Sequence, residues 1–330
     1  MEQIYGIDLA QKKFDVSYQV DERKNGHKVI KNNMKGIIRF LESLPENALL
    51  CAGHTGVYGE MLLFLCSCFN IPIALTTGYQ IRHSLGLQRG KSDKVDSVRI
   101  REYGERFRDK LVIIDYPGES MKELKELLGL RSQLVKERKM LLTYERRTMH
   151  MPFNSIKIHQ VTLNVLDNLN LAISEIESEM THIIDTNMDL RRNYTLVTDV
   201  IGIGQVTACG LIVKTDNFTA INTAKKAASY AGICPFPNSS GQMVRKSRVS
   251  RMADKELKSL LYICAVTSTR RNPEYRLYFE RKKLEGKPYF LIMNNISNKL
   301  LRTIYAVVKT GKRYQLGHIT EDPRLSEKVA

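Results

Sequence analysis

The chain has 330 residues, of which 43% are hydrophobic and 26% are charged. This length allows two domains, or one domain with a long helical insertion, and the composition is that of an ordinary soluble globular protein rather than of a disordered chain. There are 51 Lys and Arg residues against 35 Asp and Glu residues, so the formal net charge is +16. A surplus of this size requires a polyanionic partner or a large solvated surface.

The surplus is concentrated in one part of the chain. Residues 225–313 contain 20 Lys and Arg residues and 5 Asp and Glu residues, which is +15 of the net +16. A basic segment bounded in this way favours a binding surface for nucleic acid over the alternative, a merely solvated basic face.

Apolar runs and cysteine spacing indicate the compartment in which the protein works. No apolar run approaches the roughly 20 residues of a membrane-spanning helix, and the first residues lack the pattern of a signal peptide. The six cysteines are scattered, without the paired spacing of a zinc site or a disulfide framework. We therefore expect a cytoplasmic protein in a reducing compartment, with no membrane partner.

The first part of the chain alternates strand and helix signals, which predicts an α/β domain over residues 1–115. Apolar patterns predict strands at 3–10, 13–20, 27–30, 48–52 and 71–76, and helices at 34–44 and 58–69. Ser92 is a candidate N-cap for a further helix that ends near Phe107.

The segment 116–193 is predicted to be a coiled-coil helical linker. Over 119–150, apolar residues recur at three- and four-residue steps at Leu127, Leu130, Leu134, Leu141 and Tyr144. Beyond Pro152, a second series has the 3.5-residue period of a coiled coil: Leu166, Leu169, Ile173, Ile176, Met180 and Ile183, with Leu190 one heptad later. The pattern predicts an antiparallel hairpin, a dimerising arm, or both. For the first helix, the alternative is one amphipathic helix on a globular core.

Residues 194–315 are predicted to form a mainly α-helical, basic domain, and 316–330 a loosely ordered tail. Gly202 and Gly204 stand between two predicted helices, and Thr207 occupies the third position of a dinucleotide fingerprint, which argues against a Rossmann site. A helix-hairpin-helix-like turn whose amides bind a DNA phosphate is one interpretation. A simple glycine turn between packed helices is the other.

Three carboxylates are candidate metal ligands. Asp8 stands near the end of the first predicted strand, and Asp93 and Asp96 are three residues apart on one face of the helix that follows Ser92. Converging carboxylates would repel one another unless they share Mg²⁺, which can activate a water or hydroxyl against a phosphodiester. The alternative is that Asp93 and Asp96 only complement the helix dipole.

The layout of the first domain narrows its fold class. A strand that carries Asp8, a hairpin after it and a late acidic helix are the layout of an RNase-H-like fold. An actin-like ATPase could begin in the same way, but it would need a second phosphate-binding hairpin, which the sequence lacks.

A second candidate centre follows residue 234. Ser239 and Ser240 lie in a predicted flexible loop, and four basic residues come directly after it: Arg245, Lys246, Arg248 and Arg251. Such cations would bind a phosphate and stabilise the charge that develops as a serine attacks a phosphodiester. The alternative is an inert loop serine. Aromatic residues interleaved with the basic ones suit stacking on unpaired bases, or core packing: Tyr262, Tyr275, Tyr278, Phe279, Tyr289 and Phe290.

Each motif of this sequence is weak alone, but the order and spacing of the whole set are specific to one family of proteins. The motifs are Gly-Ile-Asp-Leu-Ala at 6–10, His-Thr-Gly-Val-Tyr-Gly at 54–59, Arg-Gly-Lys-Ser-Asp-Lys-Val-Asp at 89–96, Ile-Gly-Ile-Gly at 201–204, Tyr-Ala-Gly-Ile-Cys-Pro at 230–235, Ser-Ser-Gly at 239–241 and Arg-Val-Ser-Arg at 248–251. The set resembles the DEDD transposases of insertion sequences related to the Piv invertases, over residues 3–310.

The resemblance implies a RuvC-like, RNase-H-like domain joined through a coiled coil to a domain that bears a nucleophilic serine. Carried over by position, Asp8, Asp93 and Asp96 would be catalytic, Mg²⁺-binding acids. Ser240 would be the nucleophile, with Ser239 as its nearest rival. The implied partners are DNA, a noncoding bridge RNA that pairs with it, and further copies of the chain in a dimer or tetramer.

One position departs from the family pattern. The second acid of the family stands directly before His-Thr-Gly, and here that residue is Gly53. The change removes one ligand and one negative charge, which should weaken Mg²⁺ binding. Glu60 lies two helical turns further on, and we do not expect it to reach the site. The alternatives to an active recombinase are a decayed transposase that only binds nucleic acid, and an RNase-H-like junction nuclease that needs no serine.

Overall fold

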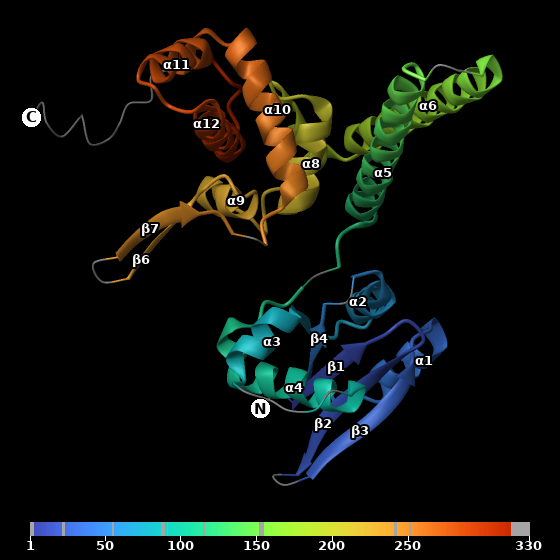
Figure 1. Ribbon diagram of the computed structural model, residues 1–330. Helices are drawn as coiled ribbons and strands as arrows, with labels where there is room; N and C mark the ends of the chain where they lie inside the picture. The colour runs from blue at the N-terminus through green and yellow to red at the C-terminus, as the bar shows by residue number, and fades with distance from the viewer. Residues whose placement is uncertain are drawn as a thin grey trace, which may run out of the picture. The chain divides into compact units, whose positions relative to one another are not determined.

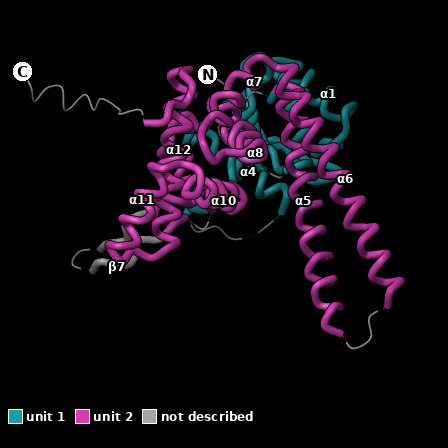
Figure 2. Tube along the Cα trace, turned by 90° about the horizontal axis from the view of Figure 1, so that it is seen from above, with its two compact units in different colours: residues 1–117 teal, residues 118–330 magenta. Residues whose placement is uncertain are grey.

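The computed structural model describes residues 3–21, 24–54, 56–86, 90, 92–114, 116–151, 155–240, 243–250 and 252–317, and for 236–240 and 243–248 it describes the backbone alone. The chain divides into two compact units, Met1–Pro117 and Gly118–Ala330 (Figure 2). Within the described residues, no helix is both long and apolar enough to cross a membrane. Residues 318–330 of the predicted tail lie outside the described part.

The first unit is built on a five-stranded mixed sheet (Figure 1). Its strands are β1 (Gln3–Leu9), β2 (Lys13–Asp21), β3 (Lys24–Lys31), β4 (Ala48–Gly53) and β5 (Ile73–Thr76). They lie in the order β3-β2-β1-β4-β5, with the first three antiparallel and β4 and β5 parallel to β1. The predicted α/β class is confirmed for this unit, and each predicted strand is present.

Helices cover both faces of the sheet because its inner strands are apolar on both sides. On one face, α1 (Met34–Glu42) and α2 (Glu60–Cys68) pack with Ile7 and Phe14. On the other face, α4 (Asp93–Arg106) packs with Ile4 and Cys51. The shorter helices of this unit are η1 (Gly56–Gly59), α3 (Gly78–Ser84) and η2 (Arg108–Lys110). All six cysteines are free, as expected.

The second unit begins with two long helices, α5 (Glu119–Thr148) and α6 (Ile156–Thr186), which lie side by side (Figure 1). Side chains that pair between the two helices rise in number along α5 while their partners fall in number along α6. Arg131 Nε lies 2.7 Å from Glu177 Oε1, Arg138 Nη1 lies 3.0 Å from Asn170 Oδ1, and Glu145 pairs with His159. The predicted antiparallel hairpin is therefore present.

The structure agrees with the apolar seam predicted for the second long helix better than with the one predicted for the first. On α6, five of the predicted positions are buried: Leu166, Ile173, Ile176, Met180 and Ile183. On α5, Leu127 and Leu134 are partly buried against the core, whereas Leu130 and Tyr144 are 50% and 45% exposed, so the predicted seam is wrong at these two positions. The inward face also includes Leu124, Leu128 and the polar residues that pair with α6. Leu190 belongs to a separate helix, α7, because helix α6 ends at Thr186 and Asn187 caps the next helix.

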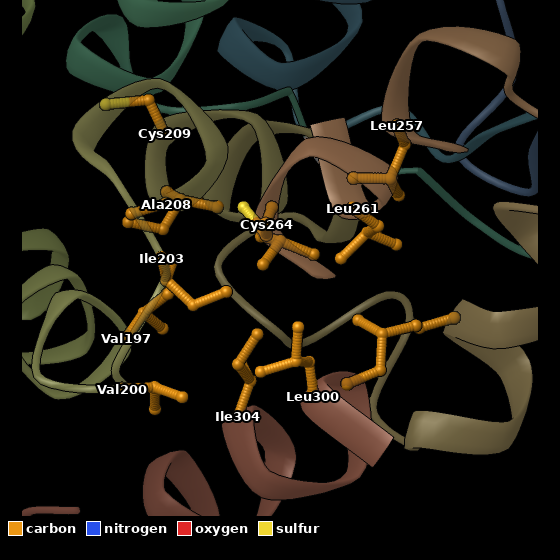
Figure 3. Packing of buried hydrophobic residues seen from close by; sticks show 14 of the residues in the cluster. Val197, Val200, Ile203, Ala208, Cys209, Leu257, Leu261, Cys264, Leu300 and Ile304 are labelled. Carbon is orange, nitrogen blue, oxygen red and sulfur yellow. The ribbon is translucent and has the colours of Figure 1, made fainter. Parts of the chain in front are cut away.

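Six further helices complete the second unit: α7 (Met188–Thr198), α8 (Gln205–Thr215), α9 (Ala224–Tyr230), α10 (Lys255–Arg271), α11 (Pro273–Leu284) and α12 (Tyr289–Thr310). Their apolar faces share one core, and Figure 3 shows part of it around Val197 of α7, Cys264 of α10 and Leu300 of α12. Leu124 of α5 and Met180 of α6 belong to the same core. The domain boundaries predicted at 115 and 193 stay predictions. The mainly helical character predicted for this region is confirmed, with one exception, the hairpin of β6 (Phe236–Ser240) and β7 (Met243–Arg248).

Candidate functional site

The carboxylate of Asp8 belongs to the face of the sheet that α4 covers. Side chains alternate between the two faces along a strand, and Ile4 on β1 and Cys51 on β4 both pack with α4. Asp8 and Gly53 are therefore on this same face. Ile7 pairs with Ala52 in the parallel ladder, so Asp8 and Gly53 come next to each other on the two strands.

Helix α4 runs back across this face with its first turn at the level of Asp8. A Cβ atom at Gly104 would approach Ile4, and one at Gly6 would approach Ser97 and Arg101, so the helix and β1 run in opposite directions. The Ser92 hydroxyl accepts a hydrogen bond from the Val95 amide at 3.3 Å, as the sequence predicts. The cap places Asp93 and Asp96 in the first turn of α4.

Asp93 and Asp96 also lie on the correct side of that helix. A Cβ atom at Gly53 would lie 3.4 Å from Ile100 Cδ1, so Ile100 faces the sheet. Asp96 and Asp93 precede Ile100 by one and two helical turns, which puts them on the same side. The structure therefore brings the three predicted acids to one end of one sheet face, around Gly53.

Basic side chains enter this acidic end. Lys13 Nζ lies 3.2 Å from Asp15 Oδ2 and 3.3 Å from Asp93 Oδ2, and these two carboxylates raise the pKa of Lys13. Asp15 is buried and also contacts His27 Nε2 at 2.7 Å. Asp96 Oδ1 lies 3.0 Å from Arg99 Nη1. Two of the candidate ligands are therefore already neutralised by neighbouring cations.

Asp15 is a site residue that the sequence reasoning missed. It pairs directly across from Asp8 in the β1–β2 ladder, so both carboxylates lie on the same face of the sheet. The signal was the strict alternation of Phe14, Asp15 and Val16, in which a charged residue stands between two fully buried ones. A carboxylate in that position marks the polar side of the strand.

The acids do not form a complete metal site as they stand. Within the described residues, no group of three or more His, Cys, Asp or Glu side chains is arranged to hold a metal ion. The ion pairs of Asp93 and Asp96 draw these carboxylates toward Lys13 and Arg99. Gly53, next to Asp8 on the neighbouring strand, contributes no side-chain ligand. The residues present thus supply only part of the Mg²⁺ site implied by the family pattern, with three of its four acids in place.

Gly53 nevertheless has space for a side chain. The nearest atoms to a Cβ atom built there are Ile100 Cδ1 at 3.4 Å and Ile7 O at 4.0 Å, which are ordinary contacts. Glu60 does not replace the missing acid on this face, because it begins α2, which packs on the opposite face of the sheet.

The predicted glycine turn joins α7 to α8. Gly202 has a φ of +98°, and Ser268 of α10 donates a hydrogen bond at 2.9 Å to the neighbouring Ile201 carbonyl. A Cβ atom at Gly202 would lie 2.0 Å from Ser268 Oγ, whereas one at Gly204 would meet nothing within 4 Å. Gly202 is therefore a packing position against α10, and Gly204 is the exposed glycine at the start of α8.

The two glycines give a matched pair of variants. We expect Gly202→Ala to lower the free energy of unfolding by about 2–4 kcal/mol, because it combines an unfavourable backbone angle with a steric overlap. Gly204→Ala should cost less than about 1 kcal/mol, since φ is −100° there and the space is open. Urea denaturation of both variants measures the difference, and equal losses would contradict this assignment.

The structure corrects the prediction of a flexible serine loop. Ser239 and Ser240 are the last two residues of β6, and they pair with Val244 and Met243 of β7. Gly241 and Gln242 between the strands lie outside the described residues. The sequence signal for these strands is the Gly-x dipeptide at 241–242, since such a dipeptide between two short runs is typical of a two-residue hairpin connection.

The predicted cations are distributed along the partner strand. In the backbone register, Arg245 is opposite Asn238, Arg248 is opposite Phe236, and Lys246 lies between them on β7. Arg251 lies outside the described residues. Ser240 and the three basic residues that the structure describes are thus carried by one short hairpin.

The base of this hairpin is firmly attached to the helices. The Asp254 amide donates to the Tyr230 carbonyl at 2.8 Å, and Asn294 Nδ2 donates to the Ile233 carbonyl at 2.7 Å. Lys214 Nζ lies 2.7 Å from Asp254 Oδ2. Burial alone would raise the pKa of Asp254, but the Leu257 amide and Lys214 outweigh it and hold the pKa below its usual value.

An α/β unit that gathers carboxylates at one end of its sheet, followed by a basic, mainly helical unit with a hairpin that carries Ser240, is the organisation of a DNA-processing enzyme of the transposase class. A family model described as a transposase, of the DEDD type named for IS110, matches residues 5–150. A second, described as the transposase IS116/IS110/IS902 family, matches residues 194–280. The chain therefore belongs to the IS110 family of transposases.

Individual relatives agree with the family models. The pilin gene-inverting proteins of Moraxella lacunata and Moraxella bovis are each 26% identical over 320 residues, which is 94% of this chain and 96% of those proteins. An uncharacterized 43.6 kDa protein of insertion element IS110 from Streptomyces coelicolor is 27% identical over 120 residues, which is 36% of this chain and 30% of that protein.

Proposed function

We propose that this transposase cuts and rejoins DNA strands through attack of Ser240 on a phosphodiester. The observation that carries the proposal is the register of β6 and β7, which sets Arg245 opposite a residue only two positions before Ser240. Two strand residues correspond to about 7 Å, so a phosphate near Ser240 is within reach of a long cationic side chain. The likeness to gene-inverting proteins over 94% of the chain supports recombination as the outcome.

The chemistry conserves the number of ester bonds. The Ser240 oxygen attacks phosphorus, the bond from phosphorus to one deoxyribose oxygen breaks, and that oxygen takes up a proton. A deoxyribose hydroxyl of the partner strand then attacks the phosphoserine and restores the serine. Arginine side chains near the phosphate would stabilise the negative charge that develops in both steps.

The first unit contributes an RNase-H-like, RuvC-like frame in this proposal. The strand order β3-β2-β1-β4-β5, with carboxylates at the ends of β1 and α4, supports that assignment. DEDD transposase domains indicate a general dependence on divalent metal ions. We assign the binding of a metal ion, Mg²⁺, to Asp8, Asp93 and Asp96. Gly53, which lacks the acid of the family pattern, weakens the affinity for this ion.

Recognition of DNA is assigned to the basic second unit. The surplus of +15 over residues 225–313 supports phosphate binding there, including by Arg245, Lys246, Arg248 and Arg251 and by the turn at Gly202 and Gly204. We further propose that a noncoding bridge RNA pairs with donor and target DNA, and that a dimer or tetramer performs the exchange, with the α5–α6 coiled coil as its arm.

One observation favours a second candidate function. Gly53 and the absence of a complete metal-binding group among the described residues fit a decayed transposase that binds nucleic acid without cutting it. A recombination reporter in cells, which carries the chain with its own flanking DNA, separates the candidates. We expect recombined junctions with the noncoding flank and none without it. Nicked but never rejoined DNA indicates a junction nuclease, and unchanged DNA indicates the decayed form.

A further inference from the structure

Beside the base of the serine hairpin lies a cavity of about 540 Å³ within the second unit. Pro235, which directly precedes β6, and Val249, which directly follows β7, both line it. The opposite wall comes from α10 and α12, with Lys258, Tyr262 and Phe290. The cavity volume lies in the range of roughly 300–1,000 Å³ that is usual for small-ligand sites.

Phe290 gives this wall an exposed aromatic face, and Tyr262 beside it is half-buried. Phe290 is 74% exposed although it lies at the start of α12, whose later turns form the core. Its ring stacks on that of Tyr262, with centroids 6.1 Å apart and planes inclined by 26°. Tyr289, which is 45% exposed, meets Phe290 edge to face at 5.7 Å. Of the interleaved aromatic residues, Tyr275 is by contrast buried in the core.

The polar members of the lining complete the site. Lys258 is an exposed cation at the rim, suited to a phosphate. Asn294 is fixed by the hydrogen bond from its Nδ2 to the Ile233 carbonyl, which orients its carboxamide against the apolar walls. An aromatic platform, a carboxamide and a lysine are the groups that recognise a base attached to a phosphodiester chain.

We propose that this cavity, the Phe290 pocket, receives an unpaired nucleobase of the DNA strand that the hairpin handles. The inference deepens the proposed function, because it places a strand-opening site beside Ser240. Pro235 and Ser240 are five residues apart, which is about 16 Å for a strand. That length equals about five nucleotides of B-form rise, so the base lies within a few nucleotides of the attacked phosphate.

DNA is the occupant that the surroundings favour. The pocket is enclosed by the segment that carries +15 of the net charge, which disfavours a basic or apolar peptide and favours a polyanion. Flat aromatic faces accept every base by stacking, so the pocket would hold a strand open without selecting its sequence. A protein partner, a second copy of the chain and an RNA base are the alternatives that the test must distinguish.

Two probes of equal charge separate base recognition from phosphate recognition. One is an oligothymidine strand, and the other is an abasic deoxyribose-phosphate chain of the same length. We expect the full-length protein to bind oligothymidine about tenfold or more tightly than the abasic chain, as measured by fluorescence anisotropy. Phe290→Leu, which keeps an apolar side chain but loses the ring, should reduce this ratio by about tenfold, and Phe290→Trp should preserve it.

Because Phe290 is largely exposed, we expect both variants to keep the wild-type fold, and circular dichroism checks that they do. A Phe290→Leu protein that keeps the wild-type ratio overturns the proposal. A Phe290→Leu protein whose sedimentation changes while its binding ratio does not also overturns it, because a second copy of the chain then occupies the pocket. A Phe290→Leu protein whose ratio falls for oligouridine but not for oligothymidine overturns it as well, because the occupant is then an RNA base. Ser240→Ala should leave the ratio unchanged. If Ser240→Ala keeps recombination while the Phe290 effect stands, only the proposed function fails.

Discussion

Replacing Ser240 by alanine is expected to reduce strand exchange by at least about 10³-fold, because the variant lacks the hydroxyl that forms the proposed ester. Binding of duplex DNA should change by less than about twofold, since the serine is not counted among the phosphate-binding cations. Strand exchange measured with purified protein on paired duplexes, with gel-shift assays alongside, tests both statements.

Ser239→Ala is the matched control, because it removes the same hydroxyl from the preceding residue of β6. We expect it to retain activity within a few-fold of wild type. If Ser239→Ala is inactive and Ser240→Ala is active, the nucleophile is the neighbouring serine. If both variants exchange strands normally, a serine nucleophile is excluded, and the acids of the first unit would have to activate water.

Introducing a carboxylate at Gly53 is expected to have the second largest effect. The Gly53→Glu side chain would begin in ordinary van der Waals contact with Ile100 Cδ1, at 3.4 Å, on the face that holds Asp8 and the first turn of α4. A further anionic ligand in a site that already has three carboxylates should tighten divalent-ion binding by about tenfold or more, since ligand charge and number set the affinity of such sites.

Isothermal titration with Mg²⁺ and Mn²⁺ measures this gain without reference to activity. Gly53→Gln is the control, because it has nearly the same shape without the charge, and we expect it to match wild type. Recombination that appears only in Gly53→Glu identifies the natural chain as a decayed copy. Equal metal affinity in Gly53→Glu and Gly53→Gln would show that the carboxylates of Asp8, Asp93 and Asp96 do not act together with position 53.

The sequence was sufficient for the first unit because its signals are local. The two-residue period of β1 sets Asp8 on the side of the strand opposite Ile7, and the Ser92 cap fixes where α4 begins. These two features place Asp8, Asp93 and Asp96 on a strand end and in a first helical turn. What the sequence did not reveal is their immediate surroundings, since the approach of Lys13 to Asp93 depends on how β2 and α4 meet in three dimensions.

The second unit was less predictable for two physical reasons. On α5, leucine spacing indicated a seam through Leu130, but Arg131, Arg138 and Glu145 find polar partners on α6, and those pairs turn Leu130 outward. The serine hairpin was missed because its short strands have few apolar residues. Their placement depends on attachments such as Asp254 to Tyr230, which join residues far apart in the sequence.

The most direct test of the central claim is to trap the covalent intermediate. A suicide substrate, nicked so that the cut end diffuses away, should accumulate a protein–DNA adduct when incubated with the full-length protein or its Gly53→Glu variant. After digestion, mass spectrometry should locate the nucleotide on the peptide that contains Ser240, and Ser240→Ala should give no adduct. Recombined product without any adduct, or an adduct on a residue outside β6, would contradict the account.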